Sequence, residues 1–185
     1  MRSNAILAAC AALALFGTGA SAADGANEMA VVVNGFYGAY ATFHPSDGIP
    51  DARARAKYEP FVSPALDELL AQGEKAEQAF AKANKDSPPL IEGDLFTSNF
   101  EGATSFKLGA CAGNAKSAQC TVALSYDDRK DHPKDKPVAW SDTVFLVATP
   151  SGWRVDDIGY GATWAFGNKG KLTATLREAI SEAGN

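Results

Sequence analysis

The sequence has few of the residues on which metal and redox sites most often depend. It contains three cysteines and two histidines in 185 residues, and the histidines, His44 and His132, lie far apart in the chain. It also has no phosphate-binding glycine loop, zinc-protease helix motif, zinc-binding cysteine spacing or calcium-binding loop. We therefore predict neither a metal ion nor another cofactor.

The sequence also lacks an excess of positive charge. Lysine and arginine total 17 against 22 aspartate and glutamate residues, which gives a formal charge of −5. Because nucleic acids and anionic membranes attract basic surfaces, this balance argues against both as the main partner. Hydrophobic residues make up 46% and charged residues 21%, an ordinary composition for a globular domain.

The N-terminus has the pattern of a secretory signal peptide. Arg2 precedes an apolar run, Ala5–Phe16, and a site of small residues follows, so we expect cleavage after Ala22 or Ala23. The run is too short to cross a bilayer, and no later run reaches the roughly 18 residues needed. Leu7–Cys10 resembles a lipoprotein signal, but the apolar run before Cys10 is short and continues past it. We predict a signal peptide over residues 1–22 and a periplasmic or secreted protein.

Two cysteines remain once Cys10 leaves with the signal peptide. Cys111 and Cys120 lie between two strand-like runs, so a disulfide between them would close the neck of a hairpin. Its short loop predicts a stabilisation of about 2–3 kcal/mol. Because no histidine flanks either cysteine, the disulfide is favoured over a metal-binding or reactive thiol pair.

Helical periodicity dominates the first half of the remaining chain. Apolar residues recur every three or four positions over 27–43, where Gly35 and Gly38 weaken the helix and suggest a close approach of another backbone. A short helix is predicted over Asp51–Tyr58. Ser63 before Pro64 predicts the start of a longer helix that ends near Ala83. A linker-like loop is expected over 84–94.

The second half alternates with the period of β-strands. Four runs carry the inward residues Phe106, Leu108 and Ala110; Val122, Leu124 and Tyr126; Val138, Trp140, Val144 and Leu146; and a run from Trp153. Leu172, Leu176 and Ile180 then predict a short C-terminal helix. Residues 23–185 are thus predicted to form one α+β domain, with N-terminal helices packed on a curved four-stranded antiparallel meander.

Three short segments resemble a family of exported bacterial proteins of unknown function. The segments are Phe36–Tyr40, Phe61–Leu66 and Gly152–Ile158, and the resemblance covers roughly residues 29–160. That family is similar to the nuclear transport factor 2-like fold, which implies a curved sheet wrapped around helices in a cone. Isomerases, dehydratases, hydrolases, adaptors and immunity proteins all use this fold, so the resemblance implies architecture and specifies no function.

Asp142 interrupts an apolar row on the third strand. A carboxylate there must find hydrogen-bond donors, lie in a cavity or raise its pKa. A bulge at Gly152 would place Asp142 opposite Tyr160, whereas a plain two-residue turn would place it opposite Gly159 and bring Asp157 into the row. The first register suits the turn better. An acid beside Tyr160 in a cone would suit a proton-shuttling enzyme, but a carboxylate bonded to backbone N–H groups or an arginine is the favoured reading.

Several aromatic residues with polar tips are candidates for lining a ligand pocket. With Asp142, the candidates are Tyr37, Tyr40, Trp140, Tyr160 and Trp164. The segment Trp164–Phe166 lies among glycines and is the one least expected to be core. The charged run 127–136 balances acids against bases and is predicted to be a solvated hairpin tip instead of a metal site.

These features predict an exported accessory domain that binds a small apolar ligand or a protein segment, without demonstrable catalysis. One alternative is a cofactor-free isomerase, dehydratase or hydrolase that uses Asp142 and Tyr160. Another is an immunity-type inhibitor of a cell-wall enzyme. A homodimer through the outer face of the sheet is compatible with the pattern but not required by it.

Overall fold

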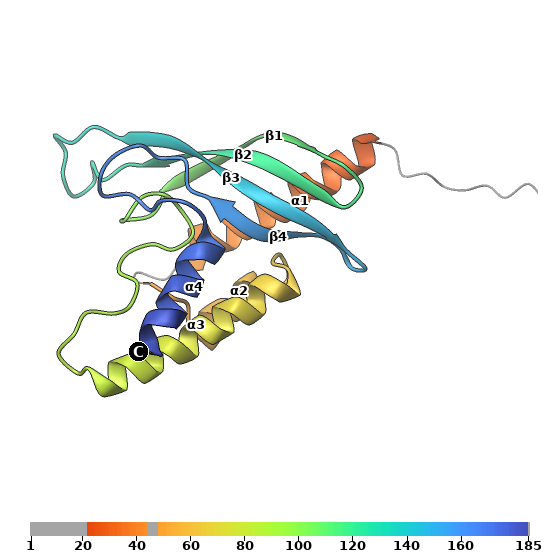
Figure 1. Cartoon of the computed structure of the whole chain (residues 1–185). Coiled ribbons are helices and arrows are strands. Elements are labelled where there is room, and N and C mark those ends of the chain that lie inside the picture. Colours follow the sequence, from red (N-terminus) through yellow and green to blue (C-terminus); the bar gives the residue numbers. More distant parts are fainter. Residues whose placement is uncertain (1–21, 44–47, 185) are drawn as a thin grey trace, which may run out of the picture.

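The computed structural model describes residues 22–43 and 48–184. The predicted signal peptide, with Cys10, and His44 lie outside these residues, except that Ala22 is the first residue of the first helix. The fold is α+β, as predicted (Figure 1). The elements in chain order are α1 (Ala22–Phe43), α2 (Ala52–Tyr58), α3 (Pro64–Ala83), β1 (Ser105–Gly113), β2 (Ser117–Tyr126), β3 (Val138–Thr149), β4 (Gly152–Gly159) and α4 (Leu172–Ala183).

The helices begin where side chains satisfy their first N–H groups. The Ser63 hydroxyl accepts the Leu66 N–H at 3.0 Å, and Pro64 is the first residue of α3, as predicted. The Asp51 carboxylate accepts the Ala54 N–H at 2.8 Å at the start of α2. Helix α1 begins earlier than predicted, at Ala22. Its buried stripe consists of Val32, Val33, Phe36, Tyr37 and Tyr40.

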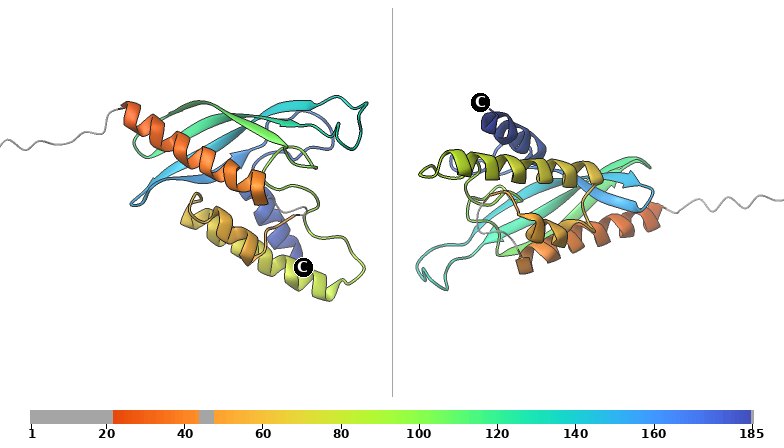
Figure 2. Two further views of the ribbon diagram at one scale, coloured as in Figure 1. Left: turned by 180° about the vertical axis from the view of Figure 1, so that it is seen from behind. Right: turned by 90° about the horizontal axis from the view of Figure 1, so that it is seen from below.

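The four strands form an antiparallel meander in the order β1-β2-β3-β4. Along β2, Ala118, Cys120, Val122 and Leu124 are buried, and the residues between them are exposed. Helix α1 lies across the buried face, whereas α3 and α4 pack on each other beside β4 (Figures 1 and 2). One face of the sheet therefore forms the core with α1, and the opposite face is more open.

A bulge in β1 changes which of its residues face the core. The pairing with β2 shifts between Leu108 and Cys111, so Ala110 is exposed and the prediction that it points inward is wrong. Cys111 instead lies directly opposite Cys120, and the two sulfur atoms are bonded at 1.95 Å. The disulfide thus lies within the strand ladder. The strands continue past it toward the turn, so it does not close the neck of the hairpin.

A second bulge, in β4, sets the register near Asp142. Gly152 pairs with Thr149, so the predicted bulge at Gly152 is wrong. The extra residue is Asp156, because Leu146 pairs with Val155 and Phe145 pairs with Asp157. Beyond it Thr143 pairs with Gly159, which aligns Asp142 with Tyr160, as the favoured register predicted. The inward row of β3 is also as predicted, except that Val138, at its start, is 41% exposed.

At the bulge, the consecutive residues Asp156 and Asp157 form hydrogen bonds to the first turns of α3 and α4. The Asp156 carboxylate accepts the Ser63 hydroxyl at 2.6 Å, at the start of α3. Asp157 accepts both the N–H and the hydroxyl of Thr173 at 3.0 Å, at the start of α4. In a regular strand the side chains of Asp156 and Asp157 would point to opposite faces of the sheet, and the bulge changes this. Carboxylates are also favoured at helix N-termini, where the helix dipole is positive. Strand β4 therefore anchors both α3 and α4.

Two glycines of α1 differ in their surroundings. A Cβ at Gly35 would lie 2.2 Å from Cε1 of Phe61, so a side chain approaches this glycine closely, not another backbone as predicted. A Cβ at Gly38 would meet nothing within 4 Å. Only Gly35 is therefore required by packing.

We expect Gly35→Ala and Gly38→Ala to change stability in opposite directions. Gly38→Ala should raise the free energy of unfolding by about 1 kcal/mol, because alanine favours the helix and has room. Gly35→Ala should lower it by about 1–3 kcal/mol, because Phe61 must move. Urea unfolding of both variants measures this difference, and equal changes would contradict the described packing.

Candidate functional site

Asp142 is almost completely buried, at 1% exposure, and both oxygen atoms of its carboxylate accept hydrogen bonds. The backbone N–H of Ser98 and the indole Nε1–H of Trp140 donate to Oδ2 at 2.8 and 3.1 Å. The backbone N–H of Gly161 donates to Oδ1 at 2.9 Å, and the Ser98 hydroxyl also contacts Oδ1. The acid on the apolar row thus has a full set of donors, which compensates for its burial.

Ser98 extends this network to the segment that follows β4. Its hydroxyl oxygen accepts the N–H groups of Gly161 and Ala162 at 2.9 and 3.2 Å while its hydrogen faces Asp142. A Cβ at Gly161 would lie 2.1 Å from the carbonyl oxygen of Ser141, so only glycine fits there. Asp142 and Ser98 therefore join three segments: the loop before β1, strand β3 and the chain after β4.

A second buried acid, Asp94, orders the loop before β1. One carboxylate oxygen accepts the N–H groups of Phe96 and Thr97 at 2.8 Å, and the other accepts the Tyr40 hydroxyl at 2.7 Å. Tyr40 in turn accepts the Ala103 N–H at 2.8 Å. Burial, and then Asp94, raise the pKa of Tyr40 far above its usual value, so its hydroxyl remains a donor.

The loop itself differs from the predicted linker. It runs beyond residue 94 to Thr104, and residues 94–99 are buried. The Tyr160 hydroxyl donates to the Leu95 carbonyl at 2.7 Å, and the Asn168 amide donates to the carbonyls of Asp94 and Thr97 at 2.7 Å. These bonds satisfy backbone groups that a buried loop would otherwise leave unpaired.

Tyr37 is buried, but its hydroxyl differs from the polar groups described above. Its hydroxyl has no hydrogen-bond partner among the described residues, although its ring stacks on Phe106 at 5.4 Å between centroids. Burial raises its pKa well above the usual value, and Asp142 and Asp94 raise it further. Tyr37 and Tyr40 therefore lie in the core, where the first contributes packing and the second holds Asp94.

A groove lies where the three joined segments reach the surface. It has a volume of about 580 Å³ and is open to solvent. Three of its lining residues are large and exposed: Phe166 at 90%, Phe100 at 45% and Val138 at 41%. Trp164 also lines the groove, is half-buried, and meets the Trp140 ring edge to face at 5.6 Å between ring centroids. Trp140 itself is bonded to Asp142, so the buried network supports the groove from below.

The segment Trp164–Phe166 is held by a lysine. The Lys169 Nζ donates to the carbonyl oxygens of Ala162 and Trp164 at 2.9 and 2.5 Å. The Asn168 N–H donates to the Ser98 carbonyl at 2.8 Å. The turn that presents Phe166 is therefore closed by hydrogen bonds at its base.

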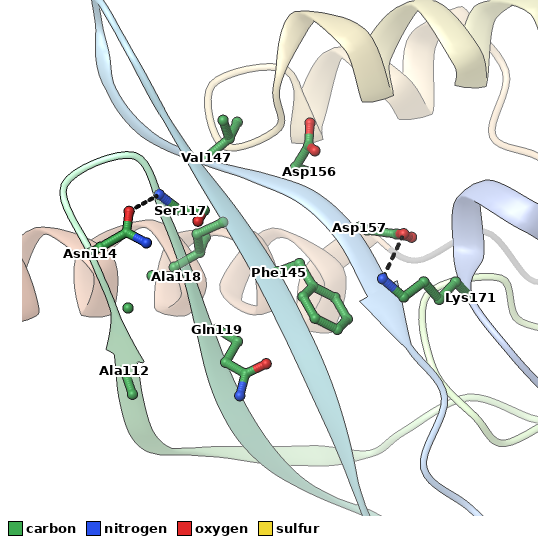
Figure 3. Close-up of a pocket in the computed structure, with 12 residues that line it drawn as sticks. Ala112, Asn114, Ser117, Ala118, Gln119, Phe145, Val147, Asp156, Asp157 and Lys171 are labelled. Carbon is green, nitrogen blue, oxygen red and sulfur yellow. Dashed lines mark hydrogen bonds and ion pairs between the residues drawn. The ribbon is translucent and has the colours of Figure 1, made fainter.

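A second pocket, of about 560 Å³, lies on the sheet face opposite α1 (Figure 3). Its residues include Asn114, Gln119 and Phe145. Lys171 could bind an anion there, but its Nζ lies 3.7 Å from Asp157 Oδ2 and 3.8 Å from the Phe145 ring centroid. Lys171 is therefore already paired with an acid and a ring, and it is not an isolated cation that awaits an anion.

The charged run 127–136 connects β2 and β3. Arg129 binds Asp127 in an ion pair at 2.5 Å, and His132 contacts Asp128. These contacts lower the pKa of Asp127 to about 2 and raise the pKa of His132. Within residues 22–43 and 48–184 no group of three or more histidine, cysteine or acidic side chains is arranged to hold a metal ion. Within the same ranges no helix is both long and apolar enough to cross a bilayer.

Compared with protein-family models and with the sequences of curated proteins, the chain matches none. The resemblance to exported proteins with a nuclear transport factor 2-like fold therefore stays a prediction.

Sequence reasoning found part of this arrangement. The predicted candidates Trp140, Asp142 and Trp164 lie together, whereas Tyr160 donates to the Leu95 carbonyl. Asp94, Ser98 and Phe100 were missed. Asp94 follows Gly93, which is a local turn signal in the sequence, and in the structure its carboxylate accepts the second and third N–H groups that follow. Ser98 and Phe100 have no such signal, because their contacts lie far away in the sequence.

We expect Asp142→Asn to lower the free energy of unfolding by about 2–3 kcal/mol. In the variant an NH2 group replaces one carboxylate oxygen. This donor would face the N–H donor of Ser98 or of Gly161, so a hydrogen bond would be lost. Asp86→Asn, at an exposed position, is the control and should stay within about 0.5 kcal/mol of the native chain. If chemical denaturation finds both variants equally stable, the network does not hold the segments together.

Two buried tyrosines should respond in opposite ways to loss of the hydroxyl. Tyr37→Phe removes a buried hydroxyl that has no partner within residues 22–43 and 48–184, and it should raise the free energy of unfolding by about 1 kcal/mol. Tyr40→Phe removes the hydrogen bonds that the Tyr40 hydroxyl makes with Asp94 and the Ala103 N–H, and it should lower the free energy of unfolding by about 2 kcal/mol. Thermal and urea unfolding measure both. A loss of stability in Tyr37→Phe would show that this hydroxyl has a bonded partner after all.

Proposed function

We propose that this chain is an exported binding domain that accepts an apolar group of a partner molecule in the groove between Phe100, Val138, Trp164 and Phe166. One observation carries the proposal. Three of the four large apolar side chains that stand exposed among the described residues line this groove, and only Val31, on α1, does not. Clustered exposed apolar side chains of this kind mark interaction sites on soluble proteins.

The support beneath the groove favours recognition over chance exposure. Ser98 lies two residues before Phe100, Gly161 precedes Trp164, and Trp140 lies two residues after Val138. All three contact the Asp142 carboxylate. The walls are therefore fixed before a partner arrives, which lowers the entropy lost on binding.

The enzymatic alternative has less support in this geometry. A general acid or base must reach the proton that it transfers. The Asp142 oxygens are occupied by Ser98, Trp140 and Gly161, and Tyr160 donates to a backbone carbonyl. No specific observation favours an inhibitor of a cell-wall enzyme.

Export rests on the N-terminal sequence pattern and on the disulfide, since disulfides persist in oxidising compartments. Protein recovered from the periplasm or medium should begin near Ala23. Trypsin cleaves after Lys116, between the cysteines, so without reduction peptides 108–116 and 117–129 should appear as one linked species. Intact Met1 together with separate, alkylated peptides would contradict export.

Binding of the neutral apolar dye Nile red tests the groove. The native chain should increase dye fluorescence, and Phe100→Ser with Phe166→Ser should reduce the increase several-fold, because the apolar walls are lost. Val31→Ser removes an apolar side chain on α1 whose exposure, 62%, lies between those of Phe100 and Phe166, and as the control it should retain the signal. Equal signals from all three proteins would refute the groove as the binding site.

A further inference from the structure

The groove is open, and this limits what can fill it. Small-molecule sites usually enclose most of their ligand. Here Phe166 is 90% exposed and stands at the rim together with Phe100 and Val138. A ligand of drug size would leave most of this rim in water, whereas a segment of a protein would cover it. The shape of the groove therefore favours a macromolecular partner.

The charged side chain that lines the groove is negative, and the Lys169 ammonium near it is bonded to the carbonyls of Ala162 and Trp164. Glu101 is the charged residue that lines the groove, and it takes part in none of the ion pairs recorded among the described residues. Arg129, from the neighbouring connection, is already bound to Asp127. Glu101 is thus open to a cation from outside the chain.

Tyr126 lies at the Val138 end of the groove, near Glu101. Tyr126 pairs with Val138 across β2 and β3. Burial and then the charges of Asp128, Glu101 and Asp131 raise the pKa of the Tyr126 phenol, and Asp128 is itself paired with His132. Glu101 lines the groove and is therefore the acid at this end that is placed to meet a cation.

On this basis, and resting on the function proposed above, we propose that the groove binds a protein segment in which an aromatic or branched aliphatic side chain lies next to lysine or arginine. The apolar side chain contacts Phe100, Trp164 and Phe166, and the cation lies at Glu101. A second copy of this chain fits less well, because a symmetric contact would bring two acidic rims together in a chain of net charge −5.

Three peptides of equal length test the proposal: acetyl-Lys-Phe-Leu-Lys-amide and its analogues with Gln or Glu in place of Lys. Binding to the 15N-labelled protein is followed by NMR at the backbone amides of residues 99–101 and 164–166. The Lys peptide should bind about two- to fivefold more tightly than the Gln peptide, and the Glu peptide should bind most weakly. The preference should shrink in 0.5 M salt, because salt screens exposed charges.

Glu101→Gln should abolish the preference for Lys over Gln while leaving the affinity for the Gln peptide unchanged. Glu92→Gln, an exposed acid in the same loop that does not line the groove, is the matched control and should keep the preference. Equal affinities of the three peptides at these amides would overturn the charge rule while leaving the apolar groove intact. Absence of shifts with every peptide would count against the groove itself, and shifts that grow with protein concentration alone would point to a second copy.

Discussion

The Asp142 carboxylate is the constraint on which the rest of the molecule depends. An isolated charge inside a protein is costly, so a buried carboxylate requires donors that stay in place. Here the donors come from Ser98, Trp140 and Gly161, three points far apart in the sequence. Satisfying one buried group therefore fixes the relative positions of a loop, a strand and a turn.

The same principle explains how a long irregular loop can be part of the core. Residues 94–99 have no helix or strand to pair their backbone groups, yet they are buried. Asp94 takes N–H groups of the loop, and Tyr160 and Asn168 supply donors to its carbonyls. The loop is thus held by side chains, and this allows it to carry Phe100 to the surface in a defined position.

The sequence could predict what is local and periodic, and not what is assembled over distance. Ser63 before Pro64 marks the start of α3 correctly, and the alternation along β2 and β3 gives the meander, because both signals lie within a few residues. The bulges at Ala110 and Asp156 were not predicted, because they depend on strand partners and docked helices. The groove was foreseen only through Trp164–Phe166, since its other walls come from distant segments.

Because Asp156 is an extra residue in β4, the positions of all later residues depend on the number of residues in this strand. Replacing that side chain would remove one hydrogen bond to Ser63. Deleting the residue would advance every later position by one, turning Asp157 away from α4 and moving Gly161 out of reach of Asp142. In the evolution of such a domain, the number of residues between the β3–β4 turn and the groove should therefore be held more strictly than their identities.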